Sequence, residues 1–245
     1  MVESETNNET SVEFNAAVKL KNAISFKNAG KYESALMSIE EALALQENYV
    51  DAWLMKGVIL GQWGRCTESL KCYDKILEID PQCTNAWHLK AATFSMQNRY
   101  DLAVDCEVKA IELEPENMDL YLRLAAFYQK LKKFEDAQKC YEELLKQKPN
   151  NPQIYYLIGI SHGNKGDYQK ALDSIDTALG LKADFTEALI VKGVLLAKLG
   201  RPDEAKLCAD KVLEIKNESE KSKPAQSNLP NYFQKDFSST QTSKK

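Results

Sequence analysis

Long apolar segments are absent from this chain of 245 residues. Its most apolar stretch, Ala188 to Leu199, is short and is interrupted by Lys192 and Lys198, whereas a membrane-spanning helix needs roughly 20 apolar residues in succession. The start of the chain, Met1 to Glu5, is acidic and polar, and it lacks the basic end and apolar run of a secretory signal. We therefore predict a soluble protein of the cytoplasm.

An excess of charge of one sign is also lacking. The chain has 32 basic and 36 acidic residues, which gives a net charge of −4. Proteins that bind nucleic acids usually show a strongly basic face. The composition therefore gives no reason to expect a nucleic-acid partner, and the lack of an apolar span gives none to expect a membrane.

Residues and motifs that carry catalysis are scarce. The only two histidines, His88 and His162, lie far apart in the sequence and have no local carboxylate or cysteine at ligand spacing. No GxGxxG, P-loop, GxSxG or HExxH pattern occurs. The six cysteines include no close CxxC pair, which argues against a disulfide framework and a zinc site. We expect a protein that is not an enzyme and that uses no cofactor, metal or small-molecule substrate.

What the sequence does contain is an internal repeat. Trp53 and Trp87 are 34 residues apart, and Pro81, Pro115 and Pro149 keep the same spacing. Such a period is typical of arrays of small structural units. The repeats fall into gapless blocks, which are 16–49, 50–83, 84–117, 118–151, 152–185 and 186–219.

The blocks share a pattern of bulky and small residues. The eighth and twentieth places are small in every block, and the fourth and eleventh places are mostly bulky. Places four, eight and eleven are spaced as i, i+4 and i+7, which puts them on one face of a helix. Glycine at the fifteenth place of four blocks predicts a tight turn after a first helix. The prolines near the block ends predict the end of a second helix, and Pro202 predicts the start of one.

Two blocks carry this pattern most fully. They contain Trp53-Gly57-Leu60-Ser69-Tyr73-Pro81 and Tyr121-Leu124-Ala125-Tyr128-Phe134-Ala137-Tyr141-Pro149. The chain thus resembles the tetratricopeptide repeat family over residues 16–219. The resemblance implies an all-α fold, with twelve antiparallel helices stacked into a right-handed superhelix, an α-solenoid.

The ends differ from the repeats in composition. Residues 1–15 are acidic and residues 220–245 are rich in Ser, Lys, Gln and Asn, so we predict disorder in both. The tail contains one segment with three aromatic residues, 229–237. Either it packs loosely or not at all, or it docks on a groove of its own chain or of a neighbour.

Four cysteines share the twenty-third place of their blocks, and they are Cys72, Cys106, Cys140 and Cys208. Equivalent atoms of adjacent helical repeats lie about 10 Å apart, which is too far for shared metal ligation. This column therefore indicates a small packing residue rather than a metal cluster.

The first helices of a helix-pair solenoid line its concave side. Places two, five, nine and twelve of each block share the helix face opposite the packing columns. They combine an apolar floor with polar edges, which is typical of a groove for an extended or amphipathic segment. The candidate groove residues are Asp51, Leu54, Val58, Asn85, His88, Ala92, Asp119, Leu122, Ala126, Gln129, Gln153, Tyr156, Ile160, Asn164, Ile190 and Val194. The alternative that some of them pack against neighbouring repeats remains open.

The best-known variant of the family grips acidic chaperone tails with a clamp of lysine and asparagine side chains. Leu20, Ile24 and Met55 occupy the matching places here, and Arg123 alone is no substitute. We therefore expect a non-catalytic scaffold that binds a peptide or amphipathic segment of a partner protein. The alternative is a structural solenoid whose ends or aromatic tail mediate self-association.

Overall fold

The computed structural model describes residues 2–221, and every regular element in that range is a helix. The twelve helices are α1 (Val2–Asn28), α2 (Tyr32–Leu45), α3 (Val50–Gln62), α4 (Cys66–Ile79), α5 (Thr84–Met96), α6 (Tyr100–Leu113), α7 (Met118–Lys130), α8 (Phe134–Gln147), α9 (Pro152–Lys165), α10 (Tyr168–Leu181), α11 (Thr186–Lys198) and α12 (Pro202–Lys221). None of these helices is both long and apolar enough to span a membrane.

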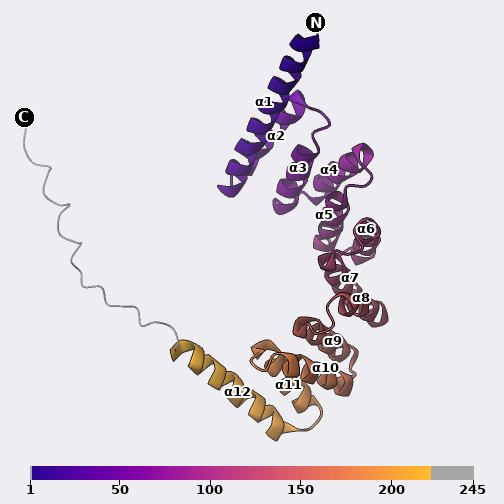
Figure 1. Ribbon diagram of the computed structural model, residues 1–245, viewed down its shortest axis with the longest axis vertical. Coiled ribbons are helices and arrows are strands. Elements are labelled where there is room, and N and C mark those ends of the chain that lie inside the picture. The colour runs from indigo at the N-terminus through magenta and orange to yellow at the C-terminus, as the bar shows by residue number, and fades with distance from the viewer. Residues whose placement is uncertain (1, 222–245) are drawn as a thin grey trace, which may run out of the picture.

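The helices follow one another as pairs along an arc (Figure 1). Each odd-numbered helix packs against the even-numbered helix that follows it, and each one after α1 also packs against the even-numbered helix before it. The odd-numbered helices lie toward the inner side of the arc, and the even-numbered helices toward its outer side (Figure 1). The predicted all-α repeat solenoid is confirmed.

The helix bounds follow the repeat in the sequence. The helices α3, α5, α7, α9 and α11 begin at residues 50, 84, 118, 152 and 186, at intervals of 34. The helices α4, α6 and α8 end two residues before Pro81, Pro115 and Pro149, because the residue that precedes a proline is disfavoured in helical conformation. Pro202 is the first residue of α12, where its missing N–H is not needed.

The turns inside the pairs need a left-handed residue. Four pairs use glycine at this point, with φ angles between 71° and 95°, and these residues are Gly30, Gly64, Gly166 and Gly200. The third and fourth pairs have Asn98 and Lys132 there, both with φ of 58°. A side chain in this conformation costs roughly 1–2 kcal/mol relative to glycine. The repeat pattern predicts a turn in these two blocks as well, but without a glycine it does not reveal the left-handed conformation.

Small residues at the eighth place allow the two helices of a pair to approach closely. A Cβ atom added at Gly57 would lie 2.5 Å from the Tyr73 ring, and one at Gly159 would lie 2.7 Å from Ile175. Ser69, at the small twentieth place, is fully buried, and its hydroxyl donates to the Gly57 carbonyl at 2.7 Å. The column of small residues therefore has a direct steric cause.

Ion pairs join several successive helix pairs. A lysine at the seventh place of one block contacts an acid at the twenty-fifth place of the block before it. These pairs are Lys56–Glu40 (2.6 Å), Lys90–Asp74 (2.6 Å) and Lys192–Asp176 (2.7 Å). The other two junctions hold Val108 with Leu124 and Glu142 with Ile158 at the same places. The lysine side chains of the three pairs are 18%, 19% and 29% exposed, whereas their acidic partners are 60%, 52% and 48% exposed. These contacts are therefore shielded from solvent on the lysine side only.

The N-terminal segment differs from the expectation of disorder over residues 1–15, because α1 already begins at Val2. The sequence offers a reason, since no glycine or proline occurs before Gly30 and nothing interrupts a helix there. The predicted disorder over 220–245 falls almost wholly outside the described residues, and so does the aromatic segment 229–237.

Candidate partner-binding groove

The predicted polar edge lies on the inner helices and is exposed. Asp51, Asn85, Asp119 and Gln153 all have exposed side chains near the starts of their helices. Two of these starts are fixed by asparagine caps. They are Asn117, whose side chain accepts from the Asp119 N–H at 3.2 Å, and Asn151, whose side chain accepts from the Gln153 N–H at 2.9 Å. Such caps satisfy backbone donors at a helix start.

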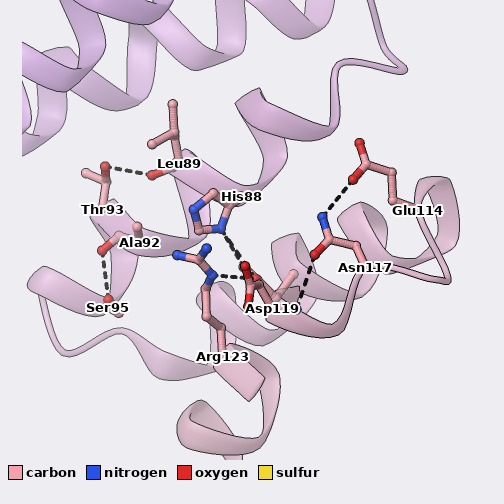
Figure 2. A network of polar contacts seen from close by, with 10 residues as sticks. His88, Leu89, Ala92, Thr93, Ser95, Glu114, Asn117, Asp119 and Arg123 are labelled. Carbon is pink, nitrogen blue, oxygen red and sulfur yellow. Dashed lines mark hydrogen bonds and ion pairs between the residues drawn. The ribbon is translucent and has the colours of Figure 1, made fainter. Parts of the chain in front are cut away.

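The Asn117 cap also contacts the preceding helix end. Its amide donates to the Glu114 carboxylate at 2.8 Å, and this hydrogen bond lowers the pKa of Glu114 (Figure 2). The Asn117 side chain thus links the end of α6, through Glu114, to the start of α7, through the Asp119 N–H.

The predicted apolar floor is only partly exposed. Leu54, Leu122 and Tyr156 are half-buried and pack against the core. The Tyr156 ring lies on Phe185 with centroids 5.0 Å apart. The alternative in which some fifth-place residues pack against neighbouring repeats therefore holds for these three side chains.

The exposure of the remaining floor residues varies along the arc. Val58, Ala92 and Ile160 are half-buried, whereas Ala126 is exposed. Ile190 and Val194, near the C-terminal end, are 53% and 56% exposed. The floor is thus a series of partly covered side chains rather than a uniform apolar strip.

A cavity of about 620 Å³ lies between α7 and α9. Six of the predicted groove residues line this cavity, and they are Leu122, Ala126, Gln129, Gln153, Ile160 and Asn164. Lys130, Lys132, Tyr141 and Leu157 complete the lining. The structure therefore brings candidate residues from two consecutive blocks to one hollow.

The cavity has a polar row beside its apolar wall. The Gln129 amide donates to the Tyr141 hydroxyl, and the Asn164 amide donates to the Gln129 carbonyl oxygen at 3.4 Å. These amides fix one another's orientation, and their remaining donors and acceptors suit the backbone of an extended segment. Lys130 and Lys132 add positive charge at the rim.

His88 has a carboxylate partner that sequence reasoning missed. Its Nδ1 atom lies 3.4 Å from both carboxylate oxygens of Glu107, and the Arg123 Nε atom lies 3.8 Å from one of them. The Glu107 side chain is fully buried, whereas those of His88 and Arg123 are 15% and 45% exposed. Figure 2 shows the His88 and Arg123 side chains close to each other, and they come from α5 and α7.

A signal for this cluster was present in the sequence. Glu107 occupies the twenty-fourth place of its block, where the second and fourth blocks carry the buried rings of Tyr73 and Tyr141. A carboxylate in a column of core residues requires a polar partner. Glu107 lies 19 residues from His88 in the sequence, so the residues next to His88 in the sequence do not indicate this contact.

His162 lies half-buried in the packing column, as expected for a residue that replaces an aromatic ring there. Burial lowers the pKa of its imidazole. The four cysteines of the twenty-third column are buried and unpaired. Burial raises the pKa of Cys72 and Cys106 to about 11 and that of Cys140 to about 12, so these thiols are packing residues.

Comparisons with known structures support the fold. A tetratricopeptide repeat protein from Parabacteroides merdae superposes with a TM-score of 0.69 at 14% identity, over 82% of this chain and 79% of that one. Pseudomonas aeruginosa pilF gives 0.63 at 17% identity, over 86% and 99% of the two chains. YrrB, described as a TPR protein with an unusual peptide-binding site, gives 0.56 at 21% identity, over 73% and 92%. At these identities the likeness concerns the fold.

Sequence comparisons give a family assignment. No curated protein matches the chain. Two family models do match, and both are described as tetratricopeptide repeat. One matches residues 20–83 and 156–216, and the other matches residues 96–159. Together with the arc of helix pairs, these matches show that the chain belongs to the tetratricopeptide repeat family.

Proposed function

We propose that this protein is a non-catalytic scaffold that binds a peptide or amphipathic segment of a partner protein in the groove formed by its odd-numbered helices. The observation that carries the proposal is the cavity between α7 and α9, where apolar side chains and a row of amides meet. Tetratricopeptide repeat proteins in general bind protein or peptide partners, and YrrB is described as having a peptide-binding site.

The chemistry of the cavity suggests what such a segment would present. Leu122, Leu157 and Ile160 offer an apolar wall for one face of a helix or for alternate side chains of a strand. Gln129 and Asn164 offer hydrogen bonds to its polar side. A micromolar dissociation constant, about −8 kcal/mol, is typical of a contact of this size in which a few side chains dominate.

We propose no role for nucleic acid, a membrane, a small-molecule substrate or a cofactor. We also propose that the protein acts in the cytoplasm.

The experiment places a charge in the cavity without disturbing the core. Ala126 is exposed on α7, so Ala126→Glu should leave the helical circular dichroism unchanged. The matched control is Ala44→Glu, at an exposed alanine on the outer helix α2. Partners captured by the wild type are identified by mass spectrometry, and their segments are then titrated as labelled peptides by fluorescence anisotropy.

We expect Ala126→Glu to weaken binding of such a peptide at least about tenfold, because a carboxylate would lose water when the segment covers it. Ala44→Glu should bind as the wild type does. Equal binding by all three proteins would show that the partner uses another surface.

A further inference from the structure

The last helix pair leaves an apolar hollow open at the C-terminal end of the arc. The hollow measures about 500 Å³ and lies between α11 and α12. All of its lining residues are aliphatic or glycine, among them Ile190, Gly193, Val194, Ala209, Val212 and Leu213. No polar side chain lines it to hold water in place.

The first helix pair shows what normally covers this face. Leu20 and Leu43, at the fifth and twenty-eighth places, are 9% and 7% exposed, because α3 packs over them and joins their core cluster. The residues at the same places of the last pair are Ile190 and Leu213, which are 53% and 57% exposed. No helix follows α12 within residues 2–221.

The hollow also lacks a side chain that other pairs possess. The twenty-fourth place holds the fully buried rings of Tyr73 and Tyr141 in the second and fourth blocks. The last block has Ala209 there, and this alanine is exposed. The end of the arc is therefore both uncovered and short of a ring-sized group.

We propose that the chain's own segment 229–237 fills this hollow and closes the end of the solenoid. Its apolar residues are Leu229, Tyr232, Phe233 and Phe237. They follow a spacing of i, i+3, i+4 and i+8, which places them on one face of a short helix. Pro230 near its start is compatible with a first helical turn. Such a helix would lie where the first helix of a seventh pair would pack.

The length of the connecting chain permits this contact. The stretch of α12 from Leu213 to its end at Lys221 is about 12 Å long at 1.5 Å per residue. The linker 222–228 can span about 24 Å when extended, so Leu229 can return to the level of Leu213. An aromatic side chain covers about 150–250 Å² when buried, which suits the open aliphatic surface. This closure uses two of the predicted groove residues, Ile190 and Val194, but none of the residues that line the cavity between α7 and α9.

The test uses the full chain with the photoreactive residue p-benzoylphenylalanine in place of Phe233. After irradiation at low protein concentration, we expect crosslinks to residues of α11 and α12 in material that elutes as a single chain. Ala209→Glu should lower the yield of these crosslinks about tenfold, because its carboxylate would lose water under the segment. The control Ala44→Glu should leave the yield unchanged.

Absence of crosslinks to α11 and α12 would overturn the proposal. So would crosslinks found only between two chains, an outcome that would identify a second copy as the occupant.

A second measurement does not depend on any substitution in the last helix pair. Leu229, Tyr232, Phe233 and Phe237 are all replaced by serine in the full chain, and the fluorescence of anilinonaphthalene sulfonate is recorded. The dye signal should rise because the hollow is uncovered. Replacing Ser238 and Ser239 by alanine is the matched control, and it should give the wild-type signal. An unchanged signal in the serine variant would contradict the closure.

Discussion

Replacing Glu107 with isoleucine is expected to stabilise the protein. The carboxylate is fully buried, yet the side-chain nitrogen atoms that contact it lie at 3.4 Å, for His88 Nδ1, and at 3.8 Å, for Arg123 Nε. Strong charge-assisted hydrogen bonds measure about 2.7–2.9 Å. These longer contacts leave part of the cost of removing the carboxylate from water without compensation.

The fold already accepts isoleucine at this place. Ile39 and Ile175 occupy it in the first and fifth blocks, and both are fully buried. Replacing a buried ion pair with a well-packed apolar residue commonly stabilises a protein by about 1–4 kcal/mol. Because Arg123 is 45% exposed and can be solvated alone, we expect Glu107→Ile to raise the free energy of unfolding by about 1–2 kcal/mol.

His88→Ala should have the opposite effect. It leaves the buried carboxylate with Arg123 alone, and breaking a buried pair from one side costs about 3–5 kcal/mol. In the Glu107→Ile background the same change should cost far less, because no buried charge remains to be left unpaired. The two substitutions are therefore expected to be strongly non-additive.

Urea unfolding followed by far-ultraviolet circular dichroism measures all four proteins. Solenoids can unfold in parts, so tryptophan fluorescence, which reports on Trp53, Trp63 and Trp87 in the second and third blocks, is recorded in parallel as a local probe. A loss of stability in Glu107→Ile, or simple additivity of the two changes, would refute the view that the carboxylate is held at an energetic cost.

Other measurements follow from pKa shifts and backbone angles. The thiols of three buried cysteines should react with iodoacetamide at pH 8 roughly 100-fold more slowly than an ordinary thiol, since the thiolate is the reactive form and burial raises their pKa. They are Cys72, Cys106 and Cys140. The half-exposed Cys66 should react first, and equal rates in the folded protein would contradict this. Burial lowers the pKa of His162 below its ordinary value of 6.5, so the unfolded chain takes up the proton more readily. Stability should therefore fall as the pH drops below about 6.5, and His162→Tyr should reduce this loss in urea titrations at pH 7.5 and 5.5; identical pH dependence in the two proteins would count against it. Lys132→Gly should raise stability by about 0.5–1 kcal/mol, because lysine sits there at a φ of 58°. Lys133→Gly, at a φ of −87°, is the control and should destabilise; a similar loss in both would refute the role of the left-handed turn.

The sequence predicts the helical frame well because its signals are steric and periodic. The prolines and small residues recur at fixed places. The prolines end a helix of their own block, and the small residues let the two helices of that block approach closely. Gly57 and Gly159 illustrate this, since an added Cβ would collide with a side chain of the paired helix in both blocks. The starts of the inner helices could therefore be read from residue spacing alone.

Most features that the sequence did not reveal depend on contacts between helices. Whether Leu122 or Ala126 is exposed depends on how closely the next helix packs, and no pattern within one block states that distance. The contact of His88 with Glu107 joins two helices of one pair, and Arg123 reaches it from the next. The left-handed conformation of Lys132 was missed for another reason, because the fold imposes it without a glycine to mark it.

The ion pairs at the junctions make some units of the chain interchangeable. Deletion of residues 50–83 would bring Glu40 against Lys90, and the new boundary would carry the same pairing of acid and lysine as the two boundaries that it replaces. Deletion of residues 84–117 would instead set Asp74 against Leu124, a carboxylate against an aliphatic side chain. Loss or duplication of the second unit by recombination would thus preserve a matched boundary, whereas loss of the third would not. The arc can change its length at the N-terminal units while keeping the central cavity between α7 and α9 intact.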